Sequence, residues 1–324
     1  MTDNLLEIRD LAVEYHTDDA VVHAVNGVNL SVKRGETIGL VGETGAGKTT
    51  IARSILRILQ TPPAKFCGGE ILYNGQDIMT LSEREMRKIR GNKIAMIFQD
   101  PMTALNPIEK VGFQIAEAIK LHNKITKPEA ERRACDMLET VGIPMERYNE
   151  YPHQFSGGMK QRVVIAMALA CNPELLLADE PTTALDVTIQ AQVLEMMQSL
   201  REKFGASVVL ITHDLGVVAD SCDSVAVIYA GEIAEYGTAE HIFDHPAHPY
   251  TVGLFNSLPK LNSTERRLKP IKGLMPDPMN LPKGCKFCDR CQNATDRCAE
   301  APPGVVEVSP GHLVKCVLAG RGDA

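Results

Sequence analysis

GETGAGKT, at residues 42–49, matches the pattern of a phosphate loop. It follows the apolar run Ile38–Val41, which predicts a strand, and it leads into a predicted helix that begins at Lys48. Glycines in such a loop let backbone N–H groups surround phosphate oxygens, while Lys48 can reach the β- and γ-phosphates and the Thr49 hydroxyl can bind Mg²⁺. The segment therefore predicts an α/β fold with a nucleotide site where the strand meets the helix.

Further apolar runs alternate with helical patterns as far as about residue 240. The predicted strands are Thr37–Val41, Ile94–Phe98, Leu175–Asp179, Val208–Thr212 and Val225–Tyr229. Such alternation is typical of a mostly parallel sheet covered by helices. A helix is also predicted after Asp186, because apolar residues recur there at steps of three or four and form a stripe that faces the core. These residues are Ile189, Val193, Met196, Leu200 and Phe204.

A second set of polar residues ends the predicted strands. Asp179 and Glu180 close the run Leu175–Asp179, and carboxylates at the C-terminal ends of parallel strands face the ligand site of open α/β sheets. Asp179 can hold Mg²⁺ through water there, and Glu180 can act on the attacking water as a general base. His213 and Gln99 also follow strands, His213 placed to contact the γ-phosphate and Gln99 placed to sense Mg²⁺ or the attacking water.

Residues 155–162, Phe-Ser-Gly-Gly-Met-Lys-Gln-Arg, form a second potential anion site. Here called the Ser-Gly-Gly peptide, they offer the Ser156 hydroxyl and the N–H groups of Gly157 and Gly158 just before an apolar helix, Val163–Ala170, and a helix N-terminus attracts anions. A chain with one phosphate loop hardly needs a second for the same nucleotide. We therefore expect this peptide to serve a nucleotide held mainly by another subunit.

The segment between Val111 and Val141 is helical and charged, and Pro128 is placed to open a helix in its first turn. A helical subdomain is therefore predicted to interrupt the sheet core. The phosphate loop and the Ser-Gly-Gly peptide are expected to lie on different lobes.

Composition excludes some classes of function. The net charge of −7 and the pI of about 5.8 leave no domain-wide basic excess for broad binding to nucleic acid. The first residues lack the basic and apolar parts of a signal peptide, and no apolar run approaches the ~18 residues of a membrane span. These features predict a soluble, cytoplasmic chain without a nucleic-acid partner.

Taken together, the motifs resemble those of the nucleotide-binding subunits of ABC transporters. The motifs that carry the resemblance, in the expected order over residues 5 to about 240, are GETGAGKT, Gln99, FSGGMKQR, LLLADEP, Ala184-Leu185-Asp186 and His213. The resemblance implies a P-loop NTPase core whose mostly parallel sheet is joined by an antiparallel β-subdomain and an inserted helical subdomain, at about residues 100–165.

The resemblance also assigns roles to individual residues. It implies that Tyr15 stacks on adenine, that Glu180 hydrolyses ATP with His213 and Gln99, and that Gln99 couples to membrane subunits. The implied nucleotide-binding residues are Tyr15, Gly42, Gly45, Gly47, Lys48, Thr49, Thr50, Gln99, Ser156, Gly157, Gly158, Asp179 and Asp186, with Thr49, Gln99 and Asp179 near Mg²⁺. Phe155 and Met159 depart from the commoner Leu and Gln of the family, but Ser156 and Gly158 remain, so nucleotide contact is expected to survive.

Partners follow from the same resemblance. Two such subunits are expected to pair head to tail, so that each ATP lies between one chain's phosphate loop and the other chain's Ser-Gly-Gly peptide, and Asp186 contacts the partner. The resemblance implies a second, paralogous ATPase, two transmembrane permease subunits and an extracytoplasmic binding protein. The chain would then lie on the cytoplasmic face of the cell membrane.

Three further segments narrow the subfamily. Residues 99–107, 182–192 and 246–251 resemble the ATP-binding subunits of dipeptide, oligopeptide and nickel importers. This implies a nucleotide-binding domain at residues 1–238 and a C-terminal extension at residues 239–324. The extension carries ten of the 19 prolines and five of the nine cysteines and has little periodicity, so irregular backbone is predicted for it.

The cysteines of the extension follow the spacing C-x2-C-x2-C-x6-C-x17-C, at Cys285, Cys288, Cys291, Cys298 and Cys316. Thiolates at this density in a reducing compartment indicate an iron–sulfur cluster or zinc, with unligated thiols a third possibility. Spacing alone would select Cys285, Cys288 and Cys291 plus one distal residue. The peptide-importer resemblance instead implies Cys285, Cys291, Cys298 and Cys316 as ligands of a 4Fe-4S cluster with a structural role.

The remaining cysteines, Cys67, Cys135, Cys171 and Cys222, are scattered and are predicted to be ordinary buried thiols. The function implied by the whole pattern is ATP hydrolysis that energises import of di- or oligopeptides. Nickel import and a soluble ABC-type ATPase of iron–sulfur assembly are the alternatives.

Overall fold

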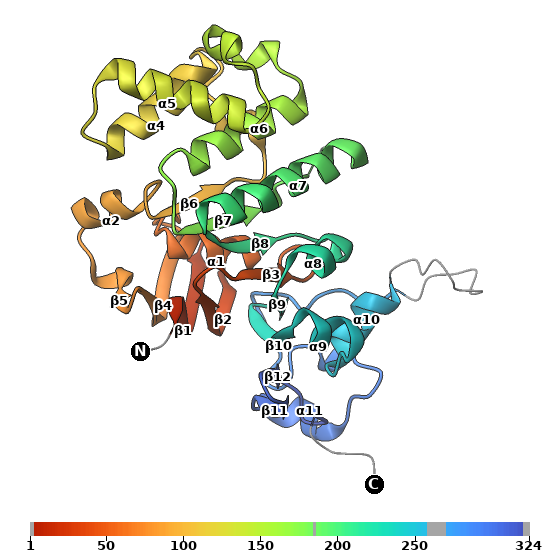
Figure 1. Cartoon of the computed structure of the whole chain (residues 1–324). Helices are drawn as coiled ribbons and strands as arrows, with labels where there is room; N and C mark the ends of the chain where they lie inside the picture. Colours follow the sequence, from red (N-terminus) through yellow and green to blue (C-terminus); the bar gives the residue numbers. More distant parts are fainter. Residues whose placement is uncertain (1–2, 184–185, 258–269, 320–324) are drawn as a thin grey trace. The chain divides into compact units, whose positions relative to one another are not determined.

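The computed structural model of the chain describes residues 3–183, 186–257 and 270–319 (Figure 1). The chain folds into two compact units, each built from several separate segments of the sequence. The first unit comprises Met1–Leu5, Val32–Thr37 and Asp77–Thr212, and the second comprises Leu6–Ser31, Ile38–Gln76 and His213–Ala324. The phosphate loop belongs to the second unit and the Ser-Gly-Gly peptide to the first.

The first unit contains three parallel strands, β6 (Ile94–Ile97), β7 (Leu175–Asp179) and β8 (Ser207–Ile211). β7 lies between β6 and β8, with Ile94 opposite Leu175 and Leu175 opposite Ser207. Every residue of the three strands is buried, as expected for a parallel sheet covered on both faces. The structure corrects two predicted bounds, because β6 ends before Phe98, which is exposed, and β8 begins at Ser207.

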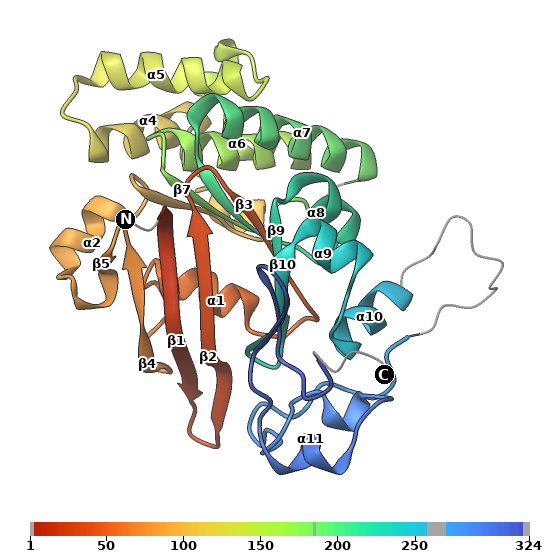
Figure 2. The same ribbon diagram turned by 60° about the horizontal axis from the view of Figure 1, so that its bottom comes forward.

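The helices of this unit include the predicted helical insert. They are α2 (Glu83–Ile89), α3 (Pro101–Ala104), α4 (Val111–His122), α5 (Lys127–Thr140), α6 (Gly157–Leu169) and α7 (Val187–Phe204), with 3₁₀ turns η1 (Ile78–Thr80), η2 (Met145–Asn149) and η3 (Pro152–Gln154). α3, α4, α5 and the first part of α6 belong to the insert, whereas α2 and α7 lie outside its predicted range. Figures 1 and 2 both show α4 and α5 side by side. Pro128 lies in the first turn of α5, as predicted.

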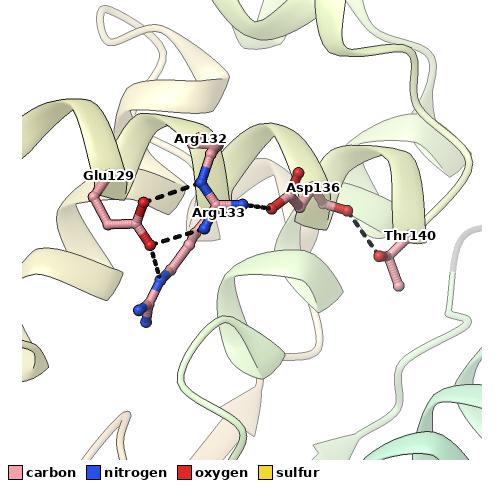
Figure 3. Close-up of polar contacts among 5 residues, drawn as sticks. All are labelled: Glu129, Arg132, Arg133, Asp136 and Thr140. Carbon is pink, nitrogen blue, oxygen red and sulfur yellow. Dashed lines mark hydrogen bonds and ion pairs between the residues drawn. The ribbon is translucent and has the colours of Figure 1, made fainter.

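The outer face of α5 is held by ion pairs within one helix (Figure 3). Glu129 accepts hydrogen bonds from Arg132 at 2.8 Å and from Arg133 at 2.9 Å, and Arg132 also reaches Asp136 at 2.9 Å. The two guanidinium groups lower the pKa of the Glu129 carboxyl to about 2. These are the i,i+3 and i,i+4 pairs that support a solvated helix face.

The second unit contains an antiparallel sheet in the strand order β2-β1-β4-β5. Its strands are β1 (Asn4–His16), β2 (Val21–Lys33), β4 (Ala64–Tyr73) and β5 (Gln76–Asp77), and β1 pairs antiparallel with β4. Figure 2 shows β1, β2 and β4 next to one another. This is the antiparallel β-subdomain that the resemblance implied.

Around the phosphate loop the second unit has a mixed set of strands. These are β3 (Thr37–Val41), β9 (Ser224–Tyr229), β10 (Glu232–Thr238), β11 (Val306–Ser309) and β12 (His312–Val314). β3 pairs parallel with β9, whereas β9, β10, β12 and β11 pair antiparallel in that order. Its helices are α1 (Lys48–Ile55), α8 (Leu215–Ser221), α9 (Ala239–Asp244), α10 (Pro249–Asn256) and α11 (Asp296–Glu300), with the turn η4 (Cys288–Arg290).

The C-terminal extension is partly regular, because α9, α10, α11, β11 and β12 correct the prediction of irregular backbone where they occur, whereas residues 270–287 contain neither helix nor strand, as predicted. α9 begins after the Thr238 cap, and α10 begins after the His248 cap with Pro249 in its first turn. β12 pairs with β10, so Tyr236 lies opposite Leu313. Prolines that indicate loops in a sequence also favour first helical turns, and pairing between distant strands leaves no local signal.

Two other expectations are corrected. Cys67 is exposed on β4 and is not a buried thiol, whereas Cys222 is buried as predicted and Cys135 and Cys171 are intermediate. Of the predicted stripe on α7, Val193 and Leu200 are buried, but Ile189, Met196 and Phe204 are only half-buried. Among the helices in residues 3–183, 186–257 and 270–319, none has the length and hydropathy needed to cross a membrane.

Candidate nucleotide site

The phosphate loop joins β3 to α1 through a backbone that requires glycine at two crowded positions. Gly42 has a φ of 151° and Gly47 a φ of 103°. A Cβ atom on Gly42 would lie 2.2 Å from the Ile228 carbonyl oxygen, and one on Gly47 would lie 2.4 Å from the Ala24 carbonyl oxygen. Gly45 is different, because its φ is 84° but the space around it is open. The loop therefore curls tightly against β9 and β2 and brings its own N–H groups near the start of α1.

Lys48 is folded back over this loop. Its side chain is buried, and Nζ donates hydrogen bonds to the carbonyl oxygens of Gly42 at 2.7 Å and Glu43 at 2.9 Å. Thr49 and Thr50 follow in the first turn of α1 and are half-buried. An ammonium group held beside the backbone N–H groups of a glycine-rich loop is suited to an anion with several negative charges.

Tyr15 lies near the end of β1 and contacts the same helix. Its hydroxyl and the Thr50 Oγ1 are 3.1 Å apart in a hydrogen bond, and the ring is half-buried. Tyr15, which is predicted to stack on adenine, is therefore joined directly to Thr50, which is also predicted to bind the nucleotide.

A second group of predicted site residues gathers at the end of β7. Asp179 is the last residue of the strand and is 1% exposed. Glu180 follows with a positive φ of 48°, and its N–H donates to the Ile211 carbonyl oxygen at 2.8 Å. The turn out of the strand thus places one carboxylate in the interior and the next one at its edge.

The Glu180 carboxylate is held by two side chains. Gln99 Nε2 donates to Glu180 Oε2 at 2.8 Å, and Thr183 Oγ1 donates to the same oxygen at 2.9 Å. The structure therefore brings together Gln99 and Glu180, which are 81 residues apart. Sequence reasoning selected both of them but missed Thr183, whose only signal was a hydroxyl three residues after the acidic pair.

The Ser-Gly-Gly peptide forms the N-terminus of α6, which begins at Gly157 rather than near Val163. Ser156 caps the helix, with its side chain accepting from the Met159 N–H at 3.4 Å, and Ser156 and Gly157 are exposed. A Cβ atom on Gly158 would lie 2.5 Å from Ile189 Cγ2, so this glycine lets α6 approach α7 closely.

Arg147 contacts both residues at which this peptide departs from the commoner pattern. Its guanidinium carbon lies 4.4 Å from the centre of the buried Phe155 ring, and its Nη1 lies 3.2 Å from the Met159 sulfur. Arg147 Nη2 also donates to the Gln154 carbonyl oxygen at 3.1 Å. The two departures thus share one arginine from η2, a residue that sequence reasoning did not select.

Two further predicted residues lie at helix starts. Asp186 caps α7 and accepts from the Ile189 N–H at 3.0 Å, while Ala184 and Leu185 lie outside the residues that the structure describes. His213 is exposed and comes two residues after β8, just before Asp214, which caps α8. His213, Tyr15 and the phosphate loop belong to the second unit, and the other predicted nucleotide residues belong to the first.

Comparison with known proteins now decides the family. Residues 25–183 match the model described as ABC transporter, and residues 234–298 match the model described as oligopeptide/dipeptide transporter, C-terminal region. The oligopeptide transport ATP-binding protein OppD of Bacillus subtilis is 53% identical over 97% of this chain and 88% of its own length. The chain belongs to the ABC transporter ATP-binding proteins. It is an ATP-hydrolysing subunit with the P-loop fold of that family.

One more curated relative and one solved structure support the same family assignment. The dipeptide transport ATP-binding protein DppD of Bacillus subtilis is 50% identical over 98% of this chain and 95% of its own length. A solved dimeric ATP-binding cassette, in a post-hydrolysis state bound to ADP and Pi, has a TM-score of 0.65 and 28% identity over 72% of this chain and 98% of the other.

The cysteines of the C-terminal extension are partly or fully buried in this ABC ATPase. Cys298 and Cys316 are buried, and Cys285 and Cys291 are half-buried. The Cys285 N–H donates to the Cys298 carbonyl oxygen at 2.7 Å, an approach that Gly284 permits, since a Cβ atom there would lie 2.2 Å from that oxygen. Burial and the neighbouring thiols of Cys316 and Cys298 raise the pKa of Cys285 to about 11. Burial and the same neighbours also raise the pKa of Cys291.

A further group of possible metal ligands was not predicted from the sequence. In the part of the chain that the structure describes, one set of three possible ligands lies within 4.8 Å of one another, formed by Glu14, His16 and Cys67. The Glu14 carboxylate is already paired with His16 Nε2 at 2.7 Å and with His23 Nδ1 at 3.1 Å. The hydrogen bond from His16 is the largest cause that lowers the pKa of Glu14. This cross-strand cluster ties β1 to β2 and β4.

Proposed function

We propose that this ABC ATPase energises import of di- or oligopeptides across the cytoplasmic membrane. The observation that carries the proposal is the match of residues 234–298 to the C-terminal region of oligopeptide and dipeptide transporters, on the same chain as the ATPase motifs. The names of the two Bacillus subtilis relatives, which specify oligopeptide and dipeptide transport, support it. Those names favour peptides over the nickel alternative and a transporter over a soluble ATPase of iron–sulfur assembly.

Uptake tests this proposal directly. Cells in which this chain is the ATPase of the importer should accumulate a labelled di- or oligopeptide. Cells that carry the Lys48→Ala variant instead should not. Radioactive nickel uptake measured in the same cells serves as the comparison. Nickel uptake that depends on the chain, with peptide uptake unaffected, would contradict the proposal.

We propose that the predicted nucleotide residues bind ATP, and that the Ser-Gly-Gly peptide and Asp186 serve a different ATP from the one held by the phosphate loop of this chain. Lys48 and the loop glycines Gly42, Gly45 and Gly47 bind the phosphates, and Tyr15 stacks on adenine. The buried position of Lys48 over the glycine-rich backbone supports this role. Thr49, Gln99 and Asp179 would hold Mg²⁺, Thr50 would bind the nucleotide, and His213 would contact the γ-phosphate.

Glu180 is proposed as the general base. Its Oε2 accepts hydrogen bonds from Gln99 and Thr183, which fix the orientation of the carboxylate that acts on the attacking water. Since Gln99 is also the proposed link to the membrane subunits, the same hydrogen bond would let the transport state control whether Glu180 is in position. A mobile Glu180 would orient water poorly and hydrolyse ATP slowly.

The Ser-Gly-Gly peptide is proposed to contact ATP held in the phosphate loop of a second ATPase subunit, paralogous to this one. The exposure of Ser156 and Gly157 at a helix N-terminus supports it, as does the dimeric state of the solved cassette. Asp186 would contact the partner across the same interface. Two permease subunits and an extracytoplasmic binding protein complete the proposed importer, which places this chain at the cytoplasmic face of the membrane.

We further propose that residues 1–238 form the nucleotide-binding domain and residues 239–324 an extension that carries a 4Fe-4S cluster. The proposed ligands are Cys285, Cys291, Cys298 and Cys316. Mutual electrostatic effects among these thiols support a shared site, and backbone N–H groups of Thr295 and Leu318 lie 3.5 Å and 3.4 Å from the sulfurs of Cys298 and Cys316. Such N–H groups stabilise thiolate charge.

The density of thiols in the tail is the feature that favours an iron–sulfur cluster, with zinc as the alternative. When bound, the cluster would supply thiolate–metal bonds that stabilise a tail with a small hydrophobic core.

Metal analysis tests the cluster. Anaerobically purified protein should contain iron and acid-labile sulfide and should show a visible absorption band. The Cys291→Ser variant should lose the band, whereas Cys288→Ser should keep it, because Cys288 is not a proposed ligand. Zinc without iron would overturn this assignment.

A further inference from the structure

Glu43, the second residue of the phosphate loop, is held by two residues of the C-terminal extension. Its carboxylate accepts two hydrogen bonds from Arg290 Nη1, at 2.9 Å and 3.1 Å. Its backbone N–H donates to the Tyr250 hydroxyl at 3.0 Å. All three residues belong to the second unit, and Arg290 is 247 residues away from Glu43 in the chain.

The Arg290 guanidinium is fixed on all sides. Its side chain is 6% exposed, while that of Glu43 is 31% exposed. Nε donates to the Lys272 carbonyl oxygen at 3.1 Å, Nη1 also reaches the Tyr229 hydroxyl at 3.3 Å, and the group lies 5.9 Å from the centre of the Phe287 ring. A planar donor held in this way offers Glu43 one defined position.

Tyr250 is fixed equally well. It is fully buried, and its ring lies 4.6 Å from the Tyr229 ring and 5.4 Å from the Phe287 ring. Phe287 stands between Cys285 and Cys288, and Arg290 stands just before Cys291. Both contacts to Glu43 are therefore anchored in the cysteine-rich segment.

The peptide that includes Glu43 also carries the carbonyl groups that position the Lys48 ammonium group. Lys48 Nζ is bonded to the carbonyl oxygens of Gly42 and Glu43. A shift of Glu43 would move these oxygens, and with them the ammonium group and the loop N–H groups that face phosphate.

We propose that Arg290 and Tyr250 are positioning residues for the phosphate loop, so that the ATP affinity of this chain depends on its cysteine-rich extension. The inference rests on the proposed role of the loop and Lys48 in binding ATP phosphates. It does not require that the extension hold a metal. Arg290 acts through Glu43 and does not itself touch the nucleotide.

A double-mutant cycle tests the proposal in the full-length chain. The Kd for MgATP is measured for wild type, Arg290→Met, Glu43→Gln and the double variant, and the KM for ATP and the kcat are measured in the assembled transporter. Arg290→Met should raise Kd and KM about tenfold, with kcat changed by less than about twofold, a size typical of coupled sites. The double variant should bind no more weakly than Arg290→Met, because both changes remove the same contact.

Two further variants separate positioning from folding. Arg297→Met removes an exposed arginine from α11 in the same extension and should keep wild-type affinity. Tyr250→Phe keeps the aromatic ring but removes the hydroxyl acceptor, and should raise Kd about threefold while lowering the melting temperature by no more than a few degrees. A wild-type chain that fails to bind ATP would refute the nucleotide role of the loop. Wild-type binding with no change in Arg290→Met and Tyr250→Phe, or purely additive effects in the cycle, would overturn the positioning role.

Discussion

At the scale of single residues, Glu180 combines an unusual backbone with a firmly held side chain. A positive φ of 48° is uncommon outside glycine and unfavourable by about 1 kcal/mol. The hydrogen bonds from its N–H to Ile211 and from Gln99 and Thr183 to its carboxylate offset that cost. Strain compensated in this way is characteristic of positions where side-chain direction matters.

Replacement of this carboxylate should separate ATP binding from hydrolysis. Glu180→Gln keeps the shape and a hydrogen-bonding oxygen but cannot take a proton, so kcat of the assembled complex should fall about 10²–10⁴-fold. The Kd for MgATP should stay within about twofold of wild type. The matched control is Glu174→Gln, just before the opposite end of β7, which should keep its turnover. Turnover that survives Glu180→Gln would reject the assignment of the base.

The buried His248 leads to a second prediction, which concerns the pH dependence of the free energy of unfolding. It is buried, its Nδ1 accepts from the Tyr250 N–H at 3.0 Å, and burial lowers its pKa from 6.5 to about 4, although Glu235 partly opposes this. Because the folded pKa lies below the unfolded one, the unfolded chain binds the proton first as pH falls. The free energy of unfolding should therefore decrease by about 3 kcal/mol between pH 6.5 and pH 4.

Denaturant unfolding at pH 7 and pH 4 measures this loss. His248→Asn can still accept the Tyr250 N–H but does not titrate, so its pH dependence should be smaller than that of wild type by about 3 kcal/mol. His245→Asn, at an exposed position three residues earlier, should behave as wild type. An identical pH dependence in wild type and His248→Asn would refute the assignment.

Individual site residues can be predicted from the sequence where a local pattern fixes both the residue type and its place at the end of a helix or strand. The phosphate loop, the acidic strand end and Ser156 each combine a residue type with an element boundary, and the structure has the first two boundaries as predicted, whereas α6 begins at Gly157 and not near Val163. Thr183, Arg147 and Arg290 were missed. Their partners depend on side chains that meet only after folding, as Arg290 meets Glu43.

At the scale of elements, α6 and α7 show how a periodic pattern can mislead. The stripe on α7 is apolar, but three of its five predicted core residues are only half-buried. One of them, Ile189, covers Gly158 on α6. A periodic stripe predicts which face of a helix is apolar. It does not predict what covers that face, and here α6 can approach α7 closely because Gly158 has no Cβ atom.

The contact between Gly158 and Ile189 is testable by stability. Gly158→Ala would place a methyl group 2.5 Å from Ile189 Cγ2, so the free energy of unfolding should decrease by about 1–3 kcal/mol. The same change in an Ile189→Ala background should cost less, since the obstructing atom is gone. Gly68→Ala, which meets nothing within 4 Å, is the control and should be close to neutral. Equal costs in both backgrounds would contradict the close packing of the two helices.

At the scale of the whole molecule, the C-terminal extension is built into the sheet that carries the phosphate loop. Glu235 of β10 is fully buried and accepts hydrogen bonds from the N–H groups of Ala247 and His248 and from His312 Nε2, all within 3.0 Å. One carboxylate thus joins β10, the start of α10 and β12. The composition of the C-terminal extension distinguishes it from the rest of the chain. Composition does not predict that β12 of the extension pairs with β10 in the sheet that carries the phosphate loop.

The two proposed anion sites of the chain, the phosphate loop and the Ser-Gly-Gly peptide, should respond separately to substitution in the assembled importer. Lys48→Ala removes the ammonium group beside this chain's own phosphate loop, whereas Ser156→Arg fills an exposed helix N-terminus with a long side chain. If ATP is shared between chains, a photoreactive ATP analogue should label this chain about tenfold less in Lys48→Ala. In Ser156→Arg the loss should fall on the partner ATPase, because the arginine obstructs the nucleotide held in the partner's loop. Ser199→Arg, exposed on α7, is the control for the added side chain. If Ser156→Arg reduced labelling of this chain alone, the Ser-Gly-Gly peptide would serve its own nucleotide, and the head-to-tail arrangement would have to be abandoned.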